Sequence, residues 1–155
     1  MAWRLVKKVF ASEAFSGEGP RIVGGRWNSR GTAVVYAAEH LSLAALEMFV
    51  GLSRVENGEA FYAYPLDIPA KVHVLTLAPS SLPLDCRAIK HPGSTRAVGD
   101  AWVRAGESAI LRVPSVLIPA EYNLILNPIH PDFRKIIIGT PEDFSFDSRM
   151  WKQHN

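Results

Sequence analysis

The chain has 155 residues, of which 48% are hydrophobic and 21% are charged, and its formal net charge at pH 7 is +2. This composition excludes an intrinsically disordered chain and supplies enough apolar side chains for one core, so we expect a single domain over residues 1–155. The small net charge, without a run of basic residues, disfavours direct nucleic-acid binding, and the single cysteine, Cys86, excludes an intramolecular disulfide and a cysteine-rich zinc site.

The N-terminal segment, residues 1–10, carries charge throughout and lacks the apolar stretch of a secretory signal. No segment approaches the roughly 18 consecutive apolar residues that a membrane-spanning helix needs. We therefore expect a cytoplasmic protein that does not associate with membranes.

The first half of the chain predicts two strands and one long helix. The strands are expected over residues 3–10 and 34–37, with a loop at 11–25 that is punctuated by Gly and Ser. The helix is expected over residues 39–54, where apolar side chains recur at helical spacing on two sides and indicate packing on both. One side comprises Leu41, Ala44, Ala45, Met48 and Leu52, and the other comprises Leu43, Leu46 and Val50.

The second half predicts mainly short strands. They are expected over residues 59–67 (with a break at Pro65), 71–77, 109–113, 122–126 and 135–139. Between them the sequence predicts an irregular segment at 78–93 and a helix at 95–105, and after them a polar tail at 140–155 with one helical turn. The continuous run from Ile136 to Ile138 indicates a strand buried on both faces. Because strands and helices do not alternate regularly, we expect an α+β fold with helices packed on sheets.

A glycine-rich turn at residues 24–31, GGRWNSRG, is the first candidate for binding chemistry. Glycines let a backbone approach a ligand closely, and the planar guanidinium of Arg26 suits phosphate oxygens, with Asn28 and Ser29 adding polar groups. The segment matches neither of the common phosphate-loop patterns, GxGxxG and GxxxxGK[ST]. It is therefore also compatible with an ordinary polar turn.

Three further residues have both a functional and a structural interpretation. Glu47 lies on the narrow polar stripe of the predicted helix, where a carboxylate either faces a cleft or forms the solvated edge. Tyr36 sits in a short apolar strand, where its ring either stacks on a ligand or packs in the core. Ser115 follows a strand end in LRVPSVLIP, and because no GxSxG pattern surrounds it, the sequence favours a turn residue over a hydrolase nucleophile.

The segment EYNLILNPIHP, residues 121–131, contains Asn123, Asn127 and His130. Asparagines that flank an apolar strand indicate side-chain-to-backbone hydrogen bonds in turns, and the position of His130 between prolines favours a structural role. The five histidines of the chain show no metal-binding spacing, so we expect no metal site.

Two blocks of sequence resemble the RES-domain toxins of bacterial toxin–antitoxin pairs, a family named for an Arg, a Glu and a Ser. In the first block, GGRWNSRGTAVVYAAEHLSLAALE, the residues Arg26, Tyr36 and Glu47 match the family pattern. The second block, LRVPSVLIPAEYNLILNPIHPDF, has Val-Pro-Ser ending at Ser115, then Asn-x-x-x-Asn-Pro and His-Pro in family order. Residues 55–105 carry little of this signature, so we predict no site residue there.

This resemblance implies a small mixed α/β domain, similar in fold to the ADP-ribosyltransferase toxins, around an NAD cleft. NAD is then the substrate, cleaved at the nicotinamide–ribose bond by hydrolysis or phosphorolysis, and no separate cofactor is implied. Arg26, Tyr36, Glu47 and Ser115 are the implied catalytic residues, and Arg26, Asn28, Tyr36 and Ser115 are the implied NAD contacts. Glu47 would stabilise positive charge at the ribose, and Arg26 would hold the diphosphate.

The resemblance also implies a partner, a cognate Xre-type helix-turn-helix antitoxin that blocks the pocket in a hetero-oligomer with a toxin homodimer. Depletion of NAD would arrest growth. Two alternatives stay open: transfer of ADP-ribose to a host protein through the same pocket, and a non-catalytic partner-binding module of the same fold. The sequence does not distinguish them, because the acceptor of ADP-ribose has no motif.

Overall fold

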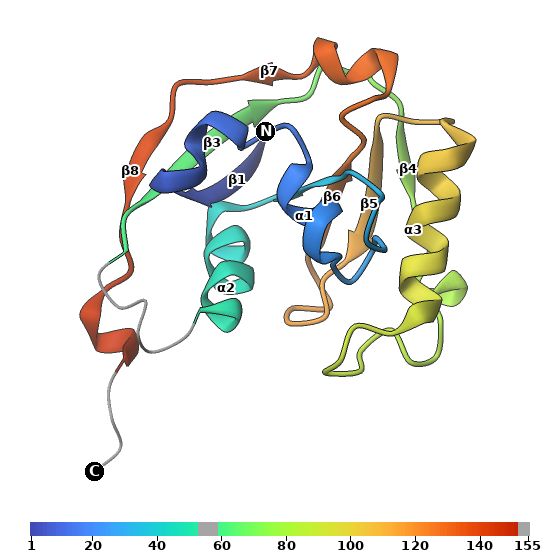
Figure 1. Cartoon of the computed structure of the whole chain (residues 1–155), viewed down its shortest axis with the longest axis horizontal. Helices are drawn as coiled ribbons and strands as arrows, with labels where there is room; N and C mark the ends of the chain where they lie inside the picture. Colours follow the sequence, from blue (N-terminus) through green and yellow to red (C-terminus); the bar gives the residue numbers. More distant parts are fainter. Residues whose placement is uncertain (53–58, 152–155) are drawn as a thin grey trace.

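One curled, mixed β-sheet organises the molecule (Figure 1), and the computed structural model describes residues 1–52 and 59–151. Within these residues the sheet has eight strands in the order β4-β5-β6-β2-β1-β3-β7, with β8 also paired to β3. Only β4 and β5 run parallel to each other; the other described pairs are antiparallel. The strands are β1 (Ala2–Lys7), β2 (Val35–Ala38), β3 (Phe61–Asp67), β4 (Val74–Thr76), β5 (Ile110–Pro114), β6 (Tyr122–Leu126), β7 (Ile137–Ile138) and β8 (Glu142–Phe144).

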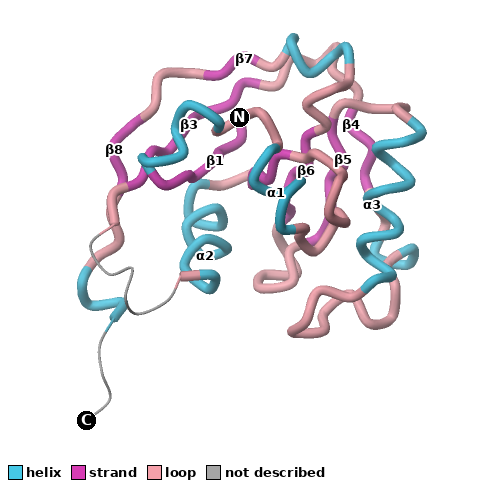
Figure 2. The backbone as a smooth tube through the Cα atoms, viewed as in Figure 1, coloured by secondary structure: helices cyan, strands magenta, loops and turns pink. Residues whose placement is uncertain are grey.

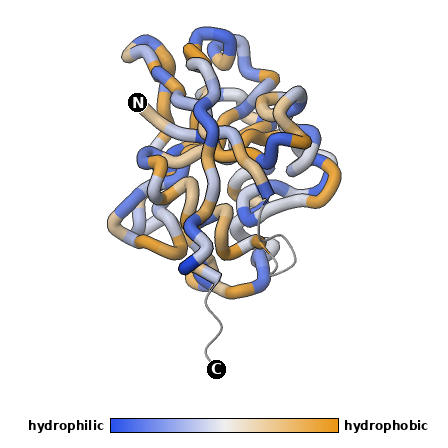
Figure 3. Tube along the Cα trace, turned by 90° about the vertical axis from the view of Figure 1, so that its left-hand side faces the viewer, coloured by the Kyte–Doolittle hydropathy of each residue, from blue (hydrophilic) through white to orange (hydrophobic). Residues whose placement is uncertain are grey.

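Short helices connect these strands (Figure 2), which confirms the predicted α+β class. The α-helices are α1 (Glu18–Val23), α2 (Leu41–Gly51) and α3 (Gly93–Ala105), and the 3-10 helices are η1 (Lys8–Glu13), η3 (Pro79–Ser81), η4 (Pro131–Lys135) and η5 (Ser148–Trp151). None of the helices in the described ranges has the length and apolarity to cross a membrane. Hydrophobic and hydrophilic segments alternate along the tube in Figure 3.

The middle of the sheet consists of β2, β6 and β5, and its side chains alternate between two faces. The register of β2 on β6 places Tyr36 beside Ile125 and Ala38 beside Asn123. Because residues two apart on a strand share a face, Tyr36, Ala38, Asn123 and Ile125 all lie on the same side of the sheet.

Two helices cover this face, one over each half of the sheet (Figure 1). α3 packs over β5 and β6 through Trp102, and α2 packs over β1 and β3 through Leu43 and Ala44. The two apolar clusters meet at β2, which contributes Tyr36 to one and Ala38 to the other. The opposite face has its own core, formed by Ala2, Val35, Ala37, Leu66, Val72, Ala109, Ile110, Leu124, Leu126 and Ile136.

The predicted loop at 11–25 is wrong over residues 18–23, which form α1. Its sequence, EGPRIV, contains Gly and Pro and has low intrinsic helix propensity. Contacts from the following turn hold it instead: the Asn28 side chain donates to the Pro20 carbonyl at 2.8 Å, and the Gly31 N–H donates to the Arg21 carbonyl at 2.8 Å.

The sequence predicts that the strand at Ile136–Ile138 is buried on both faces, and this prediction is wrong. Ile137 and Ile138 are 57% and 41% exposed, because β7 lies at the edge of the sheet and pairs only with β3. The predicted break at Pro65 is wrong, because β3 continues through it. Pro65 lies between the residues of β3 that pair with β8 and those that pair with β7, so the backbone N–H that proline lacks is not needed there. The predicted tail at 140–155 contains β8.

The helix predicted over residues 39–54 is confirmed as α2, and its first apolar side packs on the sheet as expected. The second side does not pack along its whole length, because Val50 is 60% exposed. Residues 53 and 54 of the predicted helix, and 152–155 of the predicted tail, lie outside the described residues.

Candidate functional site

The half-buried carboxylate of Glu47 on α2 is held by two side chains from the sheet. Its Oε1 accepts a hydrogen bond of 2.8 Å from the Ser115 hydroxyl and one of 2.5 Å from the Asn123 side-chain amide. Among the described residues, none donates a hydrogen bond to Oε2. The carboxylate cluster, defined as Glu47, Ser115 and Asn123, therefore has one oxygen that is not used within the described protein.

Regular secondary structure fixes each member of the carboxylate cluster. Asn123 lies on β6, which is paired on both sides, by β2 and by β5. Ser115 directly follows β5, and its hydroxyl accepts hydrogen bonds of 3.1 Å from the N–H groups of Leu117 and Ile118. Ser115 thus serves both as the turn residue that its sequence context favours and as a donor to Glu47.

Tyr36 on β2 attaches the glycine-rich turn to the sheet. Its hydroxyl donates to Asn28 Oδ1 at 2.7 Å and accepts from the Trp27 N–H at 3.0 Å. Burial raises the pKa of Tyr36 above the usual value of a phenol, so this side chain stays protonated at neutral pH. A Cβ at Gly25 would lie 2.5 Å from the hydroxyl oxygen, so only glycine allows this close approach.

Asn28 is fully buried, and its side-chain atoms bond within the protein. Its amide donates to the carbonyl oxygens of Pro20 and Thr32 at 2.8 and 3.0 Å, while Oδ1 accepts from Tyr36. Buried amides of this kind are costly unless they are satisfied, and Asn28 is satisfied by the turn that it organises.

The glycine-rich turn also rests directly on α3. The Ser29 N–H donates to Asp100 Oδ1 at 2.9 Å. Burial acts to raise the pKa of Asp100, but the hydrogen bonds from Ser29 outweigh it, and the pKa lies below its usual value. At Gly99 a Cβ would stand only 1.7 Å from the Trp27 carbonyl oxygen, so the two backbones are in contact here.

The guanidinium of Arg26 binds backbone carbonyl groups of another loop. Its Nη1 donates to the carbonyl oxygens of Cys86 and Ala88, at 2.7 and 3.0 Å. The arginine that the sequence suggests for phosphate binding therefore holds a loop that is 60 residues away along the chain.

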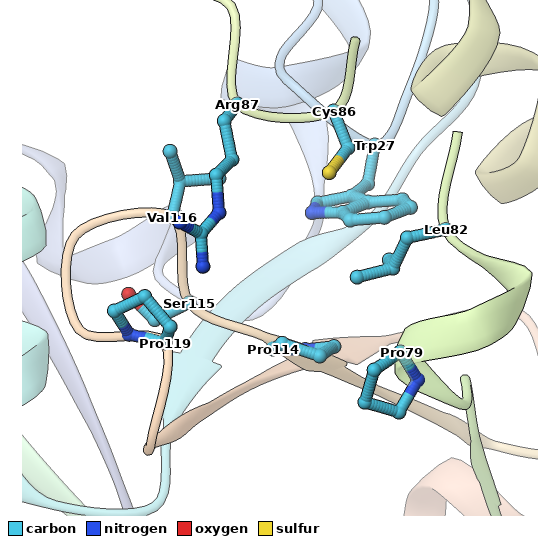
Figure 4. Close-up of a pocket in the computed structure, with 9 residues that line it drawn as sticks. All are labelled: Trp27, Pro79, Leu82, Cys86, Arg87, Pro114, Ser115, Val116 and Pro119. Carbon is cyan, nitrogen blue, oxygen red and sulfur yellow. The ribbon is translucent and has the colours of Figure 1, made fainter. Parts of the chain in front are cut away.

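A pocket of about 80 Å³ lies between these groups (Figure 4). Four of the five sequence-predicted residues line this pocket or bond to its lining: Ser115 lines it, Glu47 bonds to Ser115, Tyr36 bonds to Trp27, and Arg26 bonds to Cys86. The side chain of the fifth, Asn28, does neither. The lining residues are Trp27, Pro79, Leu82, Cys86, Arg87, Pro114, Ser115, Val116 and Pro119.

The structure brings the predicted residues into separate contacts around the pocket. Glu47 bonds to Ser115 and Tyr36 bonds to Asn28, but the structure has no bond between these two pairs. The predicted side-chain-to-backbone hydrogen bond of Asn123 is wrong, because its amide donates to the Glu47 carboxylate. A polar residue in the apolar strand YNLIL, on the face of Tyr36, is the signal that could have identified it as a site residue.

The prediction of no site residue in 55–105 stays a prediction, but the segment does contribute to the pocket wall. The segment contributes Pro79, Leu82, Cys86 and Arg87 to its lining. The local sequence of this irregular segment does not predict its place in the fold, because that place depends on distant contacts, among them the hydrogen bonds from Arg26 and the packing of Leu82.

The structural interpretations of Asn127 and His130 are confirmed. Asn127 is buried, and its Oδ1 accepts from the Ile129 N–H at 3.2 Å. His130 Nδ1 accepts from the Asp132 N–H at 3.0 Å, which leaves Nε2 as the protonated nitrogen that donates to the Gly106 carbonyl oxygen at 3.1 Å.

Comparisons with known proteins identify a matching family and named relatives. The model of the RES domain family matches residues 1–147. A relative from Yersinia enterocolitica named Toxin Res is 33% identical over 151 residues, which covers 97% of this chain and 99% of that protein. A relative from Sphingobium sp. named Prs ADP-ribosylating toxin is 35% identical over 154 residues, covering 96% of this chain and 94% of that protein.

A solved structure has a similar fold. The match is to a chain of the M. tuberculosis MbcT–MbcA toxin–antitoxin complex, with a TM-score of 0.75 and 18% sequence identity, covering 97% of this chain and 85% of that chain. At this identity the likeness concerns the fold, and it confirms the mixed α/β fold that the sequence predicts.

Proposed function

The chain belongs to the RES-domain family, and on that premise we propose that it is the toxin of a toxin–antitoxin pair and acts by cleaving the nicotinamide–ribose bond of NAD. The observation that carries this proposal is the carboxylate of Glu47, which is held by Asn123 and by Ser115, a residue of the pocket lining, and whose Oε2 accepts no hydrogen bond from the described residues.

The chemistry of the bond explains why such a carboxylate is useful. Breaking an N-glycosidic bond develops positive charge on the ribose, and a carboxylate held in place stabilises that charge without having to reorganise. Nicotinamide leaves as a neutral molecule, so the reaction does not require a strong general acid. Tyr36, which stays protonated, then acts as a neutral hydrogen-bonding and packing group rather than as a base.

The pocket accommodates only part of NAD. Its volume of about 80 Å³ is below the roughly 300–1,000 Å³ of sites that enclose whole small molecules. We assign it to one ring of the dinucleotide, next to the indole of Trp27 and the hydroxyl side of Ser115. Asn28, whose polar atoms are already bonded, then supports NAD binding by shaping the turn and not by direct contact.

The test is to mix the purified chain with NAD and measure free nicotinamide. Glu47→Gln keeps the shape of the side chain but removes its charge, and the rate is expected to fall about 100- to 1,000-fold, as when one preorganised electrostatic group is lost. Glu142→Gln, at an exposed position on β8, is the matched control and is expected to retain the wild-type rate.

Circular dichroism of both variants separates loss of activity from loss of fold. NAD that survives a long incubation with antitoxin-free wild-type protein contradicts the proposal. Running the assay with and without inorganic phosphate identifies the acceptor, because water yields ADP-ribose and phosphate yields its phosphorylated form.

A second candidate function is transfer of ADP-ribose to a protein, which the name of the Sphingobium relative, an ADP-ribosylating toxin, favours. The same pocket and the same carboxylate serve both reactions, since they share the bond that is broken. Incubation of a cell extract with the chain and NAD labelled in its adenine decides between them. Label on a protein band supports transfer, whereas label only on free ADP-ribose supports degradation.

The proposed partner is an antitoxin, because the structural neighbour was solved as a toxin–antitoxin complex. We expect an Xre-type helix-turn-helix protein, in a hetero-oligomer that contains a homodimer of this chain. Expression of the chain alone is expected to arrest growth of a bacterial host, and co-expression with the protein encoded beside it is expected to restore growth. High expression without any growth defect contradicts this assignment.

A further inference from the structure

Arg87 is the arginine in the lining of the pocket. It is exposed, lines the pocket, and makes no hydrogen bond or ion pair with other described residues. Figure 4 shows its side chain extending from the loop across the pocket toward Ser115 and Pro119. Most other arginines in the described ranges bond within the chain, namely Arg4, Arg21, Arg26, Arg96, Arg112, Arg134 and Arg149.

The backbone on both sides of Arg87 is fixed. Arg26 Nη1 bonds to the carbonyl oxygens of Cys86 and Ala88, the residues immediately before and after Arg87. Their N–H groups are also used: that of Cys86 donates to Pro83 O at 3.0 Å, and that of Ala88 donates to Asp85 O at 2.9 Å. Arg87 therefore extends from a backbone that is already ordered, which lowers the entropic cost of using its side chain for binding.

The side of the pocket formed by residues 24–31 and 83–92, the loop side, is also electropositive. Arg96 donates to the Gly25 carbonyl at 3.1 Å, which places a second guanidinium beside the glycine-rich turn. Burial lowers the pKa of His91, and repulsion from Arg26 and Arg96 lowers it further. Cationic groups therefore gather around the loop that carries Arg87, and Ser115 of the carboxylate cluster lines the same pocket as Arg87.

We propose that Arg87 binds the diphosphate of the dinucleotide and that Arg26 is a positioning residue, which acts by holding the loop that carries Arg87. A guanidinium presents paired donors that match the oxygens of a phosphate group, and the one in Arg87 is not engaged elsewhere in the described protein. The carboxylate cluster then faces the ribose that is linked to this diphosphate. This inference rests on the proposed function for the identity of the ligand.

Binding of ADP-ribose and of inorganic pyrophosphate, measured by titration calorimetry, tests the role of Arg87. Arg87→Ala is expected to weaken the binding of both by about tenfold or more, and Arg87→Lys to recover part of the loss, because lysine keeps the charge but not the paired donors. Arg134→Ala, which removes an exposed arginine on η4, is the control of equal charge change and is expected to bind like wild type. In the NAD cleavage assay Arg87→Ala is expected to raise KM with little change in kcat.

A double-mutant cycle tests the role of Arg26. If Arg26 acts only through Arg87, the double variant Arg26→Ala/Arg87→Ala binds pyrophosphate no more weakly than Arg87→Ala alone. Losses that add across the two substitutions overturn the positioning role, because they mean that Arg26 contacts the anion itself.

The outcomes separate this inference from the proposed function. If wild type cleaves NAD and Arg87→Ala binds ADP-ribose as well as wild type does, the role of Arg87 is wrong and the proposed function stands. If wild type binds pyrophosphate through Arg87 but leaves NAD intact, the anion site stands and the proposed function is wrong. Failure of wild type to bind either probe overturns the anion site.

Discussion

The two sides of the pocket are built in different ways. On one side the carboxylate cluster is carried by α2, by β6 and by the turn after β5. The loop side consists of residues 24–31 and 83–92, which contain neither strand nor helix. These residues are held by hydrogen bonds from side chains such as Arg26, Asn28 and Tyr36.

Because of this difference, we expect the carboxylate cluster to serve activity and the polar side chains of the loop side to serve stability. The strand ladder fixes the backbone around Asn123 and Ser115, so their side chains are left to act on Glu47. On the loop side the polar side chains themselves fix the backbone. Substitutions on the loop side are therefore expected to reduce stability first, and substitutions in the carboxylate cluster to reduce activity first.

The largest effect on stability is expected for Gly99→Ala. The added methyl group would stand 1.7 Å from the Trp27 carbonyl oxygen, so α3 and the glycine-rich turn must separate, at a cost of about 3 kcal/mol by the magnitudes known for overpacking. Urea denaturation measures the loss. Gly19→Ala in α1 is the control, because its methyl group meets nothing within 4 Å. An equal loss of stability in this variant would mean that the loss in Gly99→Ala does not come from the contact with Trp27.

Tyr36→Phe is expected to come next, with a loss of about 2 kcal/mol. The substitution leaves the Trp27 N–H and Asn28 Oδ1 without their partner in a buried place, and each such group costs about 1–3 kcal/mol. Tyr62→Phe, whose hydroxyl makes no hydrogen bond with the described residues, is expected to change stability by less than about 0.5 kcal/mol. Thermal unfolding of the pair checks this difference.

Asn123→Ala is expected to reduce stability less and activity more. It removes one of two donors to the Glu47 carboxylate, which is worth about 1.5 kcal/mol for a hydrogen bond to a charged group. Because Ser115 still holds the same oxygen, the fold should persist while NAD cleavage falls by about tenfold, the equivalent of that energy. Unchanged activity with a large loss of stability would reverse the proposed contrast between the two sides.

The smallest effect is a pH dependence on the loop side. The pKa of Asp100 is lower in the folded protein than in the unfolded chain, so the carboxylate stabilises the fold above a pH of about 4. This contribution is lost as the pH falls through the lower, folded-state pKa. Stability measured from pH 7 to pH 2 should decline less steeply for Asp100→Asn than for wild type, and identical slopes would exclude this role.

The sequence predicted the regular elements better than the segments between them. The apolar periodicity of α2 and of α3 placed both helices, and β6 was predicted at its observed bounds. α1 was missed, because a turn packed against it overrides the low helix propensity of Gly and Pro. The burial of Ile137 was predicted wrongly, because an apolar run does not show whether its strand lies in the middle or at the edge of a sheet.

By itself, the sequence determined the family and the identity of the candidate residues, through the order of Arg26, Tyr36, Glu47 and Ser115 in two blocks that match RES-domain proteins. Which of these residues touch depends on the tertiary structure. Glu47 and Ser115 lie 68 positions apart yet share a hydrogen bond, and Arg26 reaches a loop in which the sequence predicted no site. The physical reason is that periodicity fixes the face on which a side chain lies, whereas its partner depends on how strands distant in the chain pair and which helices cover them.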